Sequence, residues 1–331
     1  MIFIISRNTE ESTNRVIKWL LAEHVLFERI NFSDFFSNPE SFSLEITGSG
    51  RKLILQDKVY TEQELQKSVI WFRKLERFIS KDDYNLLTKS YPGVLKHLNQ
   101  EFEAFIQSFV SFFYDGYWLC HYNMRKLNKT FVLIQAQQCG LKVPDTIISN
   151  NRKTIQTFPK TKKITKCMGN GLTIEFPDHK RYLLSTNMIK GRQINSLPEY
   201  FFPSTLQSYI DKSVELRIFF IDNHFFASAI FSQESEVTKI DFRLNVIDSL
   251  PCRMVPYTLP VSIKAKLKKL MRRIGLNTGS IDMIVSPNNE YYFLEVNPFG
   301  QYGWVADLCN YPIDKTIASF LKRKHDERQN R

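Results

Sequence analysis

Cysteine is scarce in this sequence, and no two cysteines form a recognisable motif. The five cysteines among 331 residues are an odd number at wide spacings, without any Cys-x-x-Cys pair. Disulfide-stabilised secreted domains and structural zinc sites need cysteines that are denser or closely paired. The pattern therefore predicts reduced and mostly buried thiols in a cytoplasmic protein.

Long apolar segments are missing as well. No apolar run approaches the roughly 18 residues that a membrane-spanning helix requires. The first residues, MIFIISRNTEES, lack the basic segment and the apolar segment of a secretory signal. We therefore expect a soluble protein that has no membrane partner.

Several familiar catalytic motifs are absent. The expected first strand and helix are not joined by G-x-G-x-x-G, so a dinucleotide site at that turn is not supported. There is no G-x-S-x-G element, no H-E-x-x-H helix and no obvious Cys-His arrangement, and the six histidines are scattered. A reaction that uses a nucleophile supplied by the protein is therefore disfavoured.

Positive charge is in excess. The 45 Lys and Arg residues outnumber the 34 Asp and Glu residues, which gives a net charge of +11. Between Asp145 and Glu175 six basic residues occur and no acidic one. Such a balance favours an anionic partner, which can be a nucleic acid, a nucleotide or an acidic peptide. Charge alone does not choose among them, and a solvated loop explains most of the basic stretch equally well.

The first 120 residues read as an α/β lobe. Residues 2–30 predict a β-α-β unit with its helix over residues 11–22, and residues 42–61 alternate as antiparallel strands. Thr61 and Glu64 form a capping-box pattern, which predicts a helix that continues over residues 65–79. Apolar residues at three- and four-residue steps predict a second helix over residues 94–113, whose aromatic stripe belongs to the core.

A second region begins near residue 120. A helix is expected to end at Gly140, and short strands then dominate. A further helix, opened by Ser262 and closed by Gly275, places an apolar face toward the core. The sequence therefore predicts a mixed α/β (α+β) fold that is divided into several lobes.

One hairpin concentrates oxygen ligands. In SIDMIVSPNNEYYFLEVN the natural turn is Asn288-Asn289, because Asn tolerates positive φ. A two-residue loop there places Asp282 directly opposite Glu295, with Asn297 on the same face. Two carboxylates about 4 Å apart repel by about 4 kcal/mol at an effective dielectric near 20. A cation between them would offset this repulsion, and oxygen ligands of this kind suit Mg²⁺ or Mn²⁺ together with a phosphate.

Basic residues precede this hairpin at intervals along the chain. Lys166 ends an expected strand, and Gly169 and Gly171 lie in the turn behind it, where backbone N–H groups can approach phosphate oxygens. Lys129 begins a helix, and Arg217 shares a strand face with Glu215. Taken singly, each of these residues is explained equally well as a surface or turn residue.

The order of these elements resembles the ATP-grasp superfamily. That superfamily ends in an Asp followed by Glu-x-Asn on adjacent strands, as in Asp282 and LEVNP here. The segments VIWFRK, GLKVPDTIISN, VELRIFFID and FLEVNPFGQYGWV are similar to the peptide-maturase branch, which contains microviridin-type or graspetide macrocyclases and grasp-with-spasm maturases. The resemblance covers nearly the whole chain.

The resemblance implies a role for each matching residue. Lys129 and Lys166 would contact the phosphates of ATP, with Gly169 and Gly171 in a lid over them. Residues 207–210, which include Gln207, Tyr209 and Ile210, match the hinge that reads adenine, although Gln207 stands where an acidic residue is common. The remaining matches are Glu215 for the ribose, Arg217 and Arg243 for the transferred phosphoryl group, and Asp282, Glu295 and Asn297 for two Mg²⁺ ions, which Mn²⁺ could replace.

The resemblance also implies a domain organisation and a reaction. Residues 1–120 would form the pre-ATP-grasp lobe and could dock a leader peptide; residues 121–210 and 211–322 would enclose the nucleotide, and 323–331 would be a basic tail. The enzyme would convert Asp or Glu side chains of a precursor peptide into acyl phosphates. Thr, Ser or Lys side chains of that peptide would then close ester or amide rings. A nucleic-acid partner is not expected, and a homodimer is one arrangement open to the protein.

Two other functions compete with this interpretation. An ATP-grasp ligase could instead join a free amino acid to a small molecule or a protein tail. A nucleic-acid-binding protein could use residues 152–166, and its affinity would then fall steeply with salt.

Overall fold

The computed structural model describes eight segments of the chain, and they form two units. The described residues are 1–37, 42–75, 78–158, 162–169, 173–175, 181–183, 186–231 and 253–330. The first unit comprises Met1–Arg125, Gln301–Ala306 and Pro312–Arg331, and the second comprises Lys126–Gly300 and Asp307–Tyr311. None of the described helices combines the length and the apolar composition needed to cross a lipid bilayer.

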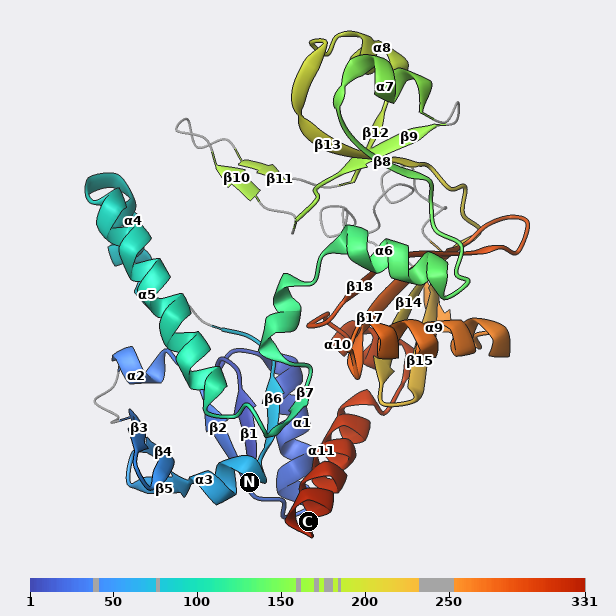
Figure 1. The fold of residues 1–331 in the computed structure, drawn as a ribbon. Helices are drawn as coiled ribbons and strands as arrows, with labels where there is room; N and C mark the ends of the chain where they lie inside the picture. Colours follow the sequence, from blue (N-terminus) through green and yellow to red (C-terminus); the bar gives the residue numbers. More distant parts are fainter. Residues whose placement is uncertain are drawn as a thin grey trace. The chain divides into compact units, whose positions relative to one another are not determined.

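A four-stranded parallel sheet forms the centre of the first unit (Figure 1). Its strands run in the order β2 (Phe27–Ile30), β1 (Ile2–Ile5), β6 (Val69–Phe72) and β7 (Tyr117–Leu119). Every residue of β1 and β6 is buried, as in parallel strands that are covered on both faces. The predicted β-α-β unit is confirmed, with α1 at Glu11–Ala22.

The predicted helix over residues 65–79 is wrong. The capping box of Thr61 and Glu64 is present, but the helix that it begins, α3 (Glu62–Gln66), lasts little more than one turn. The next four residues, VIWF, form the fully buried strand β6. A short continuous apolar run with β-branched residues is typical of a central parallel strand, and its period cannot be distinguished from that of a buried helix.

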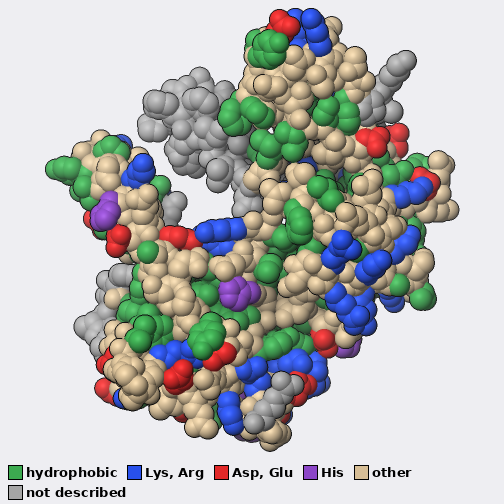
Figure 2. Space-filling view, viewed as in Figure 1, with side chains coloured by type: hydrophobic (Ala, Val, Ile, Leu, Met, Phe, Trp, Pro, Cys, Tyr) green, Lys and Arg blue, Asp and Glu red, His purple; other side chains and the backbone are tan. Residues whose placement is uncertain are grey.

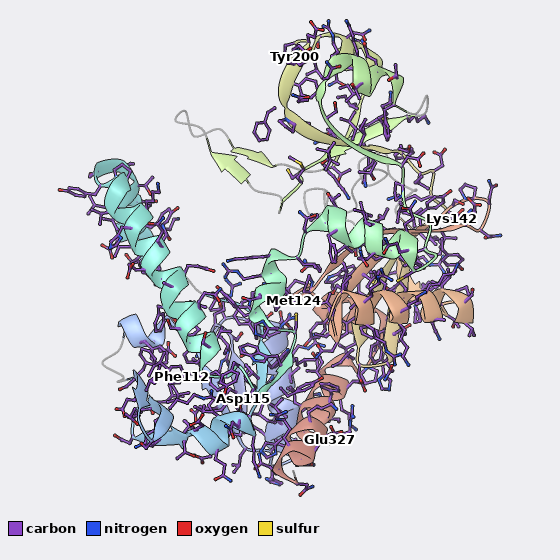
Figure 3. All side chains as sticks on the ribbon, viewed as in Figure 1. Phe112, Asp115, Met124, Lys142, Tyr200 and Glu327 are labelled. Carbon is purple, nitrogen blue, oxygen red and sulfur yellow. The ribbon has the colours of Figure 1, made fainter. Side chains whose placement is uncertain are left out.

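The aromatic stripe of the second predicted helix packs in the core of the first unit. This helix, α5, spans Pro92–Ser111, and α4 (Lys81–Ser90) precedes it. The rings of Phe105 and Phe109 lie 5.7 and 5.0 Å from the ring of Phe32, edge to face. Figure 3 labels Phe112 and Asp115, which follow the end of α5.

The remaining elements of the first unit surround its central sheet. The antiparallel strands β3 (Phe42–Thr47), β4 (Gly50–Leu55) and β5 (Lys58–Thr61) occur as predicted. The short helices are α2 (Asp34–Ser37) and the 3-10 turn η1 (Tyr122–Lys126). After α10 (Gly303–Cys309), the final helix α11 (Ile313–Gln329) lies beside α1, where Arg15 pairs with Asp314 at 2.7 Å.

The second unit contains two antiparallel sheets. The smaller sheet has the order β12 (Asn187–Ile189), β9 (Lys163–Lys166), β13 (Tyr200–Ser208) and β8 (Thr146–Asn151). Helices α7 (Arg152–Thr157) and α8 (Gly191–Asn195) accompany it, and Ile155, Ile194 and Leu206 form a small core. A separate hairpin joins β10 (Thr173–Glu175) to β11 (Arg181–Leu183).

The larger sheet has five strands. Their order is β16 (Met254–Pro256), β15 (His224–Ile230), β14 (Val214–Ile221), β17 (Thr278–Val285) and β18 (Tyr291–Asn297). Helix α6 (Lys129–Gln138) lies beside α9 (Val261–Arg273) and β18. Figure 3 labels Lys142, which follows α6 and bonds to β18 through its carbonyl oxygen.

The larger sheet separates an apolar face from a polar one. Leu216 and Ile218 on β14 pair with Met283 and Ile281 on β17, and all four side chains are buried. Because side chains alternate along a strand, Glu215, Arg217 and Asp282 lie on the opposite face. The sheet therefore presents its charged residues to one side.

Helix α9 ends where the sequence predicted but begins differently. It ends before Gly275, whose φ of +73° fits the expected glycine stop. It begins at Val261 after Pro260, so the prediction that Ser262 opens it is wrong. The rigid φ of Pro260 suits a helix entrance, and Ser262 lies inside the first turn without a capping bond.

Truncation of a buried α9 residue should destabilise the protein. Leu270 is fully buried, whereas the adjacent Lys269 is exposed. Leu270→Ala should reduce the free energy of unfolding by about 2–5 kcal/mol, because it leaves a cavity under the sheet. Lys269→Ala should change it by less than about 0.5 kcal/mol. Urea unfolding followed by circular dichroism measures both, and equal effects would contradict the assigned core face.

Candidate active site

The two carboxylates of the C-terminal hairpin lie opposite each other. Asp282 on β17 pairs with Glu295 on β18, and Asn297 pairs with Ser280. The pairing predicted from the sequence is therefore confirmed at these positions.

The turn of this hairpin is one residue longer than predicted. The backbone of Ser286 pairs with that of Glu290, and Asn289, with φ of +59°, donates its N–H to the carbonyl of Ser286. This is a three-residue loop, so the predicted two-residue loop at Asn288-Asn289 is wrong. Pro287 accounts for the difference, since its fixed φ favours the second position of a type I turn.

A β-bulge restores the register between the turn and the carboxylates. Met283 pairs with Phe293, and Asp282 pairs with Glu295, so Leu294 is the additional residue. Without the bulge, strict alternation would turn Glu295 toward the apolar face occupied by Phe293 and Met283. The bulge instead places both Leu294 and Glu295 on the face of Asp282.

This face forms one wall of a pocket between the two sheets of the second unit. The first wall comes from β9 and β13, which contribute Ile164, Lys166, Gln207 and Ser208, and Thr186 and Pro144 lie beside them. The second wall comes from β14, β17 and β18, which contribute Glu215, Arg217, Asp282, Ile284, Leu294 and Glu295. Tyr209, Ile210 and Lys212 line the connection between the walls.

Alternating charges run across the larger sheet. The ammonium of Lys212 lies 2.8 Å from Glu215, whose other carboxylate oxygen lies 2.7 Å from Arg217. Arg217 in turn contacts Asp282. On the next strand Glu295 pairs with Lys129, the first residue of α6, at 3.2 Å. The predicted common face of Glu215 and Arg217 is confirmed by both ion pairs.

Burial governs the protonation of the two facing carboxylates. It raises the pKa of Asp282 to about 7; Arg217 acts against this shift, and the carboxylates of Glu295 and Glu215 add to it. Burial also acts to raise the pKa of Glu295, but Lys129 and Lys166 outweigh it, so that pKa lies below its ordinary value. More positive charge beside Asp282 would therefore be favourable.

The residues at this site suit a magnesium ion. Asp282 and Glu295 supply two facing carboxylates, and cationic side chains already lie against each. Mg²⁺ is usually held by one or two carboxylates together with phosphate oxygens. Across the described segments no three His, Cys, Asp or Glu side chains gather as a metal site, so the donors here are this pair and the nearby amide of Asn297.

A hydrogen-bond network determines the orientation of the Gln207 amide. The hydroxyl of Thr146 donates to the carbonyl of Pro144 at 2.9 Å, and it accepts a bond from Nε2 of Gln207 at 2.8 Å. A hydroxyl has one hydrogen to donate, so the amide nitrogen must be the atom that faces Thr146. The carbonyl oxygen of Gln207 is thus the amide atom that is turned away from Thr146.

The other residues singled out in the sequence lie at varying distances from the pocket. Asn297 is exposed, and its side-chain oxygen accepts a bond from the N–H of Phe299. Gly169 is exposed beyond the end of β9, and a Cβ placed on it would meet no atom within 4 Å. Gly171 and Arg243 lie outside the described residues. The structure therefore brings together residues 207–210, Lys166, Glu215, Arg217 and the two carboxylates.

The sequence did not single out Lys212 and Leu294, which line the pocket, or Thr146, which contacts the pocket residue Gln207. Lys212 is 7% exposed and pairs with Glu215, Thr146 orients Gln207, and Leu294 forms the bulge. The spacing of Lys212 and Glu215 was visible in the sequence, but nothing there distinguished this lysine from a surface one. Only the sheet pairing brings Thr146 next to Gln207.

Comparisons with known proteins add solved structures of similar fold. No protein-family model and no curated protein matches the chain. A RiPP-associated ATP-grasp ligase from Chryseobacterium gregarium, in complex with ADP and a leader and core peptide, is 25% identical over 98% of this chain and 96% of its own, with a TM-score of 0.83. The macrocyclase MdnC from Microcystis aeruginosa, bound to its precursor peptide MdnA, is 26% identical over 98% and 99%, with a TM-score of 0.79.

A third structure shares the fold at lower identity. The ATP-grasp ligase PsnB, in complex with a precursor variant, Mg and ADP, is 14% identical over 98% of both chains, with a TM-score of 0.75. The predicted α/β class and ATP-grasp fold are thus confirmed. Over nearly its whole length the chain is similar to an ATP-grasp ligase and a macrocyclase that are bound to peptides, which supports an ADP-forming ATP-grasp ligase of the peptide-maturase kind.

Proposed function

We propose that this protein closes ester or amide rings in a ribosomally made precursor peptide, at the expense of ATP. The observation that carries the proposal is the pocket in which Asp282 and Glu295 face each other beside Lys166, Arg217 and Glu215. The similarity to the Chryseobacterium ligase and to MdnC, which are bound to peptides, supports a peptide substrate.

ATP is proposed to bind in the pocket between the two sheets. Gln207, Tyr209 and Ile210 would hold the adenine, and the carbonyl oxygen of Gln207, which is turned away from Thr146, suits the exocyclic amino group. Glu215, held between Lys212 and Arg217, would accept the ribose hydroxyls. Lys129 and Lys166 would contact the phosphates, with the segment of Gly169 and Gly171 as a lid.

Metal binding is assigned to the carboxylate pair. Asp282 and Glu295, with Asn297, would hold Mg²⁺, and we propose two ions, with Mn²⁺ as a substitute. When bound, Mg²⁺ offsets charge on the phosphate oxygens that react. Arg217, and Arg243 outside the described residues, would contribute further positive charge around the transferred phosphoryl group.

The reaction follows from these charges. A side-chain carboxylate oxygen of the peptide attacks the γ-phosphorus, and the bond from that phosphorus to the bridging oxygen breaks, so ADP leaves with the electron pair. A hydroxyl or amine of the same peptide then attacks the acyl carbon and loses its proton, and phosphate departs. The net change is one ATP hydrolysed to ADP and phosphate and one water lost from the peptide for each ring.

The lobes would divide this work. Residues 1–120 would form the lobe that docks the peptide leader, and residues 121–210 and 211–322 would enclose the nucleotide. Residues 323–331 remain a basic tail, although α11 continues through most of it.

Incubation with a candidate precursor tests the proposal. The purified protein with MgATP and a peptide that carries Thr, Ser or Lys and Asp or Glu residues should lose one water, about 18 Da, for each ring and release one ADP. Mass spectrometry and an ADP assay measure both. A mass gain equal to an added amino acid, or affinity for nucleic acid that falls steeply with salt while no peptide reacts, would reject the proposal.

Removal of one hairpin carboxylate should slow turnover strongly. Glu295→Gln keeps the shape of the side chain but loses its charge, so ring formation should slow on the order of 100-fold or more. Glu290→Gln provides the matched control, because Glu290 lies in the same hairpin and pairs with Lys142 away from the pocket. Its rate should stay within about twofold of the wild type. Unchanged rates in Glu295→Gln would remove the metal assignment.

Loss of the Gln207 amide should weaken nucleotide binding more than chemistry. Gln207→Leu removes the acceptor for adenine and leaves Thr146 without its donor, which should raise KM for ATP about tenfold. The rate at saturating ATP should change by less than about threefold, because no reacting atom is touched. Gln137→Leu, on the exposed side of α6, is the control. If KM stays constant in Gln207→Leu, adenine is read elsewhere.

A further inference from the structure

The first unit contains a second group of cations, at one edge of its parallel sheet. Because β1, β6 and β7 are parallel to one another, the residues that follow them meet at the same edge. Arg7 comes two residues after β1, Arg73 and Lys74 come directly after β6, and His121 follows β7.

The strand order at this edge is of the kind at which open parallel sheets commonly bind ligands. The connection from β1 leads to β2 on one side, and β6 lies on the other side of β1. The order of strands therefore reverses between β1 and β6, which Figure 1 shows as neighbouring arrows. Ligands of open parallel sheets bind outside the carboxyl ends of the strands at such a reversal.

Arg73 is held rigidly under this edge. Its guanidinium is 5% exposed, donates to the hydroxyl of Ser12 at 3.1 Å and lies 3.6 Å from Glu10. The rings of Trp71 and Tyr302 lie 5.8 and 5.4 Å from it, within the range of cation–π attraction. Arg73 therefore supplies a positive charge that is buried beneath the surface at the end of β6 and held in one orientation.

The carboxylate of Glu10 does not offset the positive charge of Arg7, Arg73 and Lys74. Besides Arg73, its oxygens accept bonds from the hydroxyl of Ser12 and from both the hydroxyl and the N–H of Thr13. In the described segments neither Arg7 nor Lys74 forms an ion pair. The Nε atoms of Arg7 and Arg73 are buried and have no hydrogen-bond partner among the described residues. Among the described residues, Arg7, Arg73 and Lys74 therefore lie around Glu10, whose two oxygens already accept bonds from Ser12 and Thr13.

The surroundings of Lys74 disfavour its charged form. Burial lowers its pKa; Glu10 acts in the opposite direction, and Arg7 and Arg73 lower the pKa further. Arg7 and Lys74 are both partly exposed, so an anion can reach them, whereas Arg73 is buried. An anion at this edge would complete the hydrogen bonding and offset the excess charge.

We propose that Arg7 and Lys74, supported by Arg73, form a carboxylate-binding site for acidic side chains of the peptide substrate. The inference rests on the proposed function, because only that function supplies a peptide with Asp and Glu side chains. Arg7 presents a planar fork that suits a carboxylate, and Lys74 adds a compact charge. The site would hold an acidic residue of the peptide other than the one that reacts.

Peptide binding without turnover tests this site. The probe is a fluorescein-labelled twelve-residue peptide of alternating Thr and Glu, and its neutral counterpart carries Gln at each Glu position. Anisotropy at 150 mM NaCl should show that the Arg7→Gln/Lys74→Gln variant binds the acidic peptide about tenfold or more weakly than the wild type does. The ratio of the affinities for the acidic and the neutral peptide should therefore be lower in this double variant than in the wild type.

A matched variant separates this site from general charge effects. Lys89→Gln/Lys96→Gln removes the same two charges from exposed positions on α4 and α5 of the same unit. Its affinity for the acidic peptide should stay within about twofold of the wild type. Equal losses in the two double variants would overturn the proposal, and so would competition by inorganic phosphate at concentrations where acetate has no effect. Thermal unfolding and ATP binding should match the wild type in both variants.

The experiment also distinguishes this inference from the proposed function. If the wild type binds the acidic peptide through Arg7 and Lys74 but no precursor loses water, the binding site stands and the ring-closing function fails. If rings close while Arg7→Gln/Lys74→Gln binds and reacts as the wild type does, the function stands and this site fails.

Discussion

The repulsion between Asp282 and Glu295 is the constraint on which the site depends. Two carboxylates on adjacent strands are unfavourable unless positive charge lies beside them, and each here has its own cation. Arg217 comes from the neighbouring strand and Lys129 from the start of α6, so both elements supply a cation to the carboxylate pair. Further positive charge remains favourable because burial keeps the pKa of Asp282 high. An enzyme that handles a highly charged nucleotide and a metal needs such a balance.

Backbone irregularity makes this constraint possible. The bulge at Leu294 changes the register by one residue, and a single residue is enough to exchange the two faces of a strand. Phe293 and Val296 can therefore remain in the core while Glu295 reaches the pocket. Strand β18 thus contributes apolar side chains to the core on one face of the sheet and a carboxylate to the pocket on the other face.

Both units gather charged side chains on a sheet, but at different places: in the second unit within the strands, and in the first unit just beyond the strand ends. In the second unit cations and carboxylates alternate across an antiparallel sheet, and each finds a partner. In the first unit cations gather at the carboxyl edge of a parallel sheet, and the carboxylate of Glu10 beside them already accepts bonds from other residues. This difference follows from topology, because parallel strands bring their ends to one edge, whereas antiparallel strands bring side chains face to face.

The sequence alone determined features that depend on short range. The first β-α-β unit, the capping box at Thr61 and the stop at Gly275 follow from neighbouring residues and local periodicity. The sequence also predicted that Asp282 faces Glu295, but this pairing holds only because the bulge compensates for a turn one residue longer than predicted. Tertiary structure decided the rest. Burial on both faces makes residues 69–72 a strand, although the capping pattern favoured a longer helix. The bulge at Leu294, the bond from Gln207 to Thr146 and the pairing of Lys212 depend on strands that meet only after folding, and no local pattern contains that information.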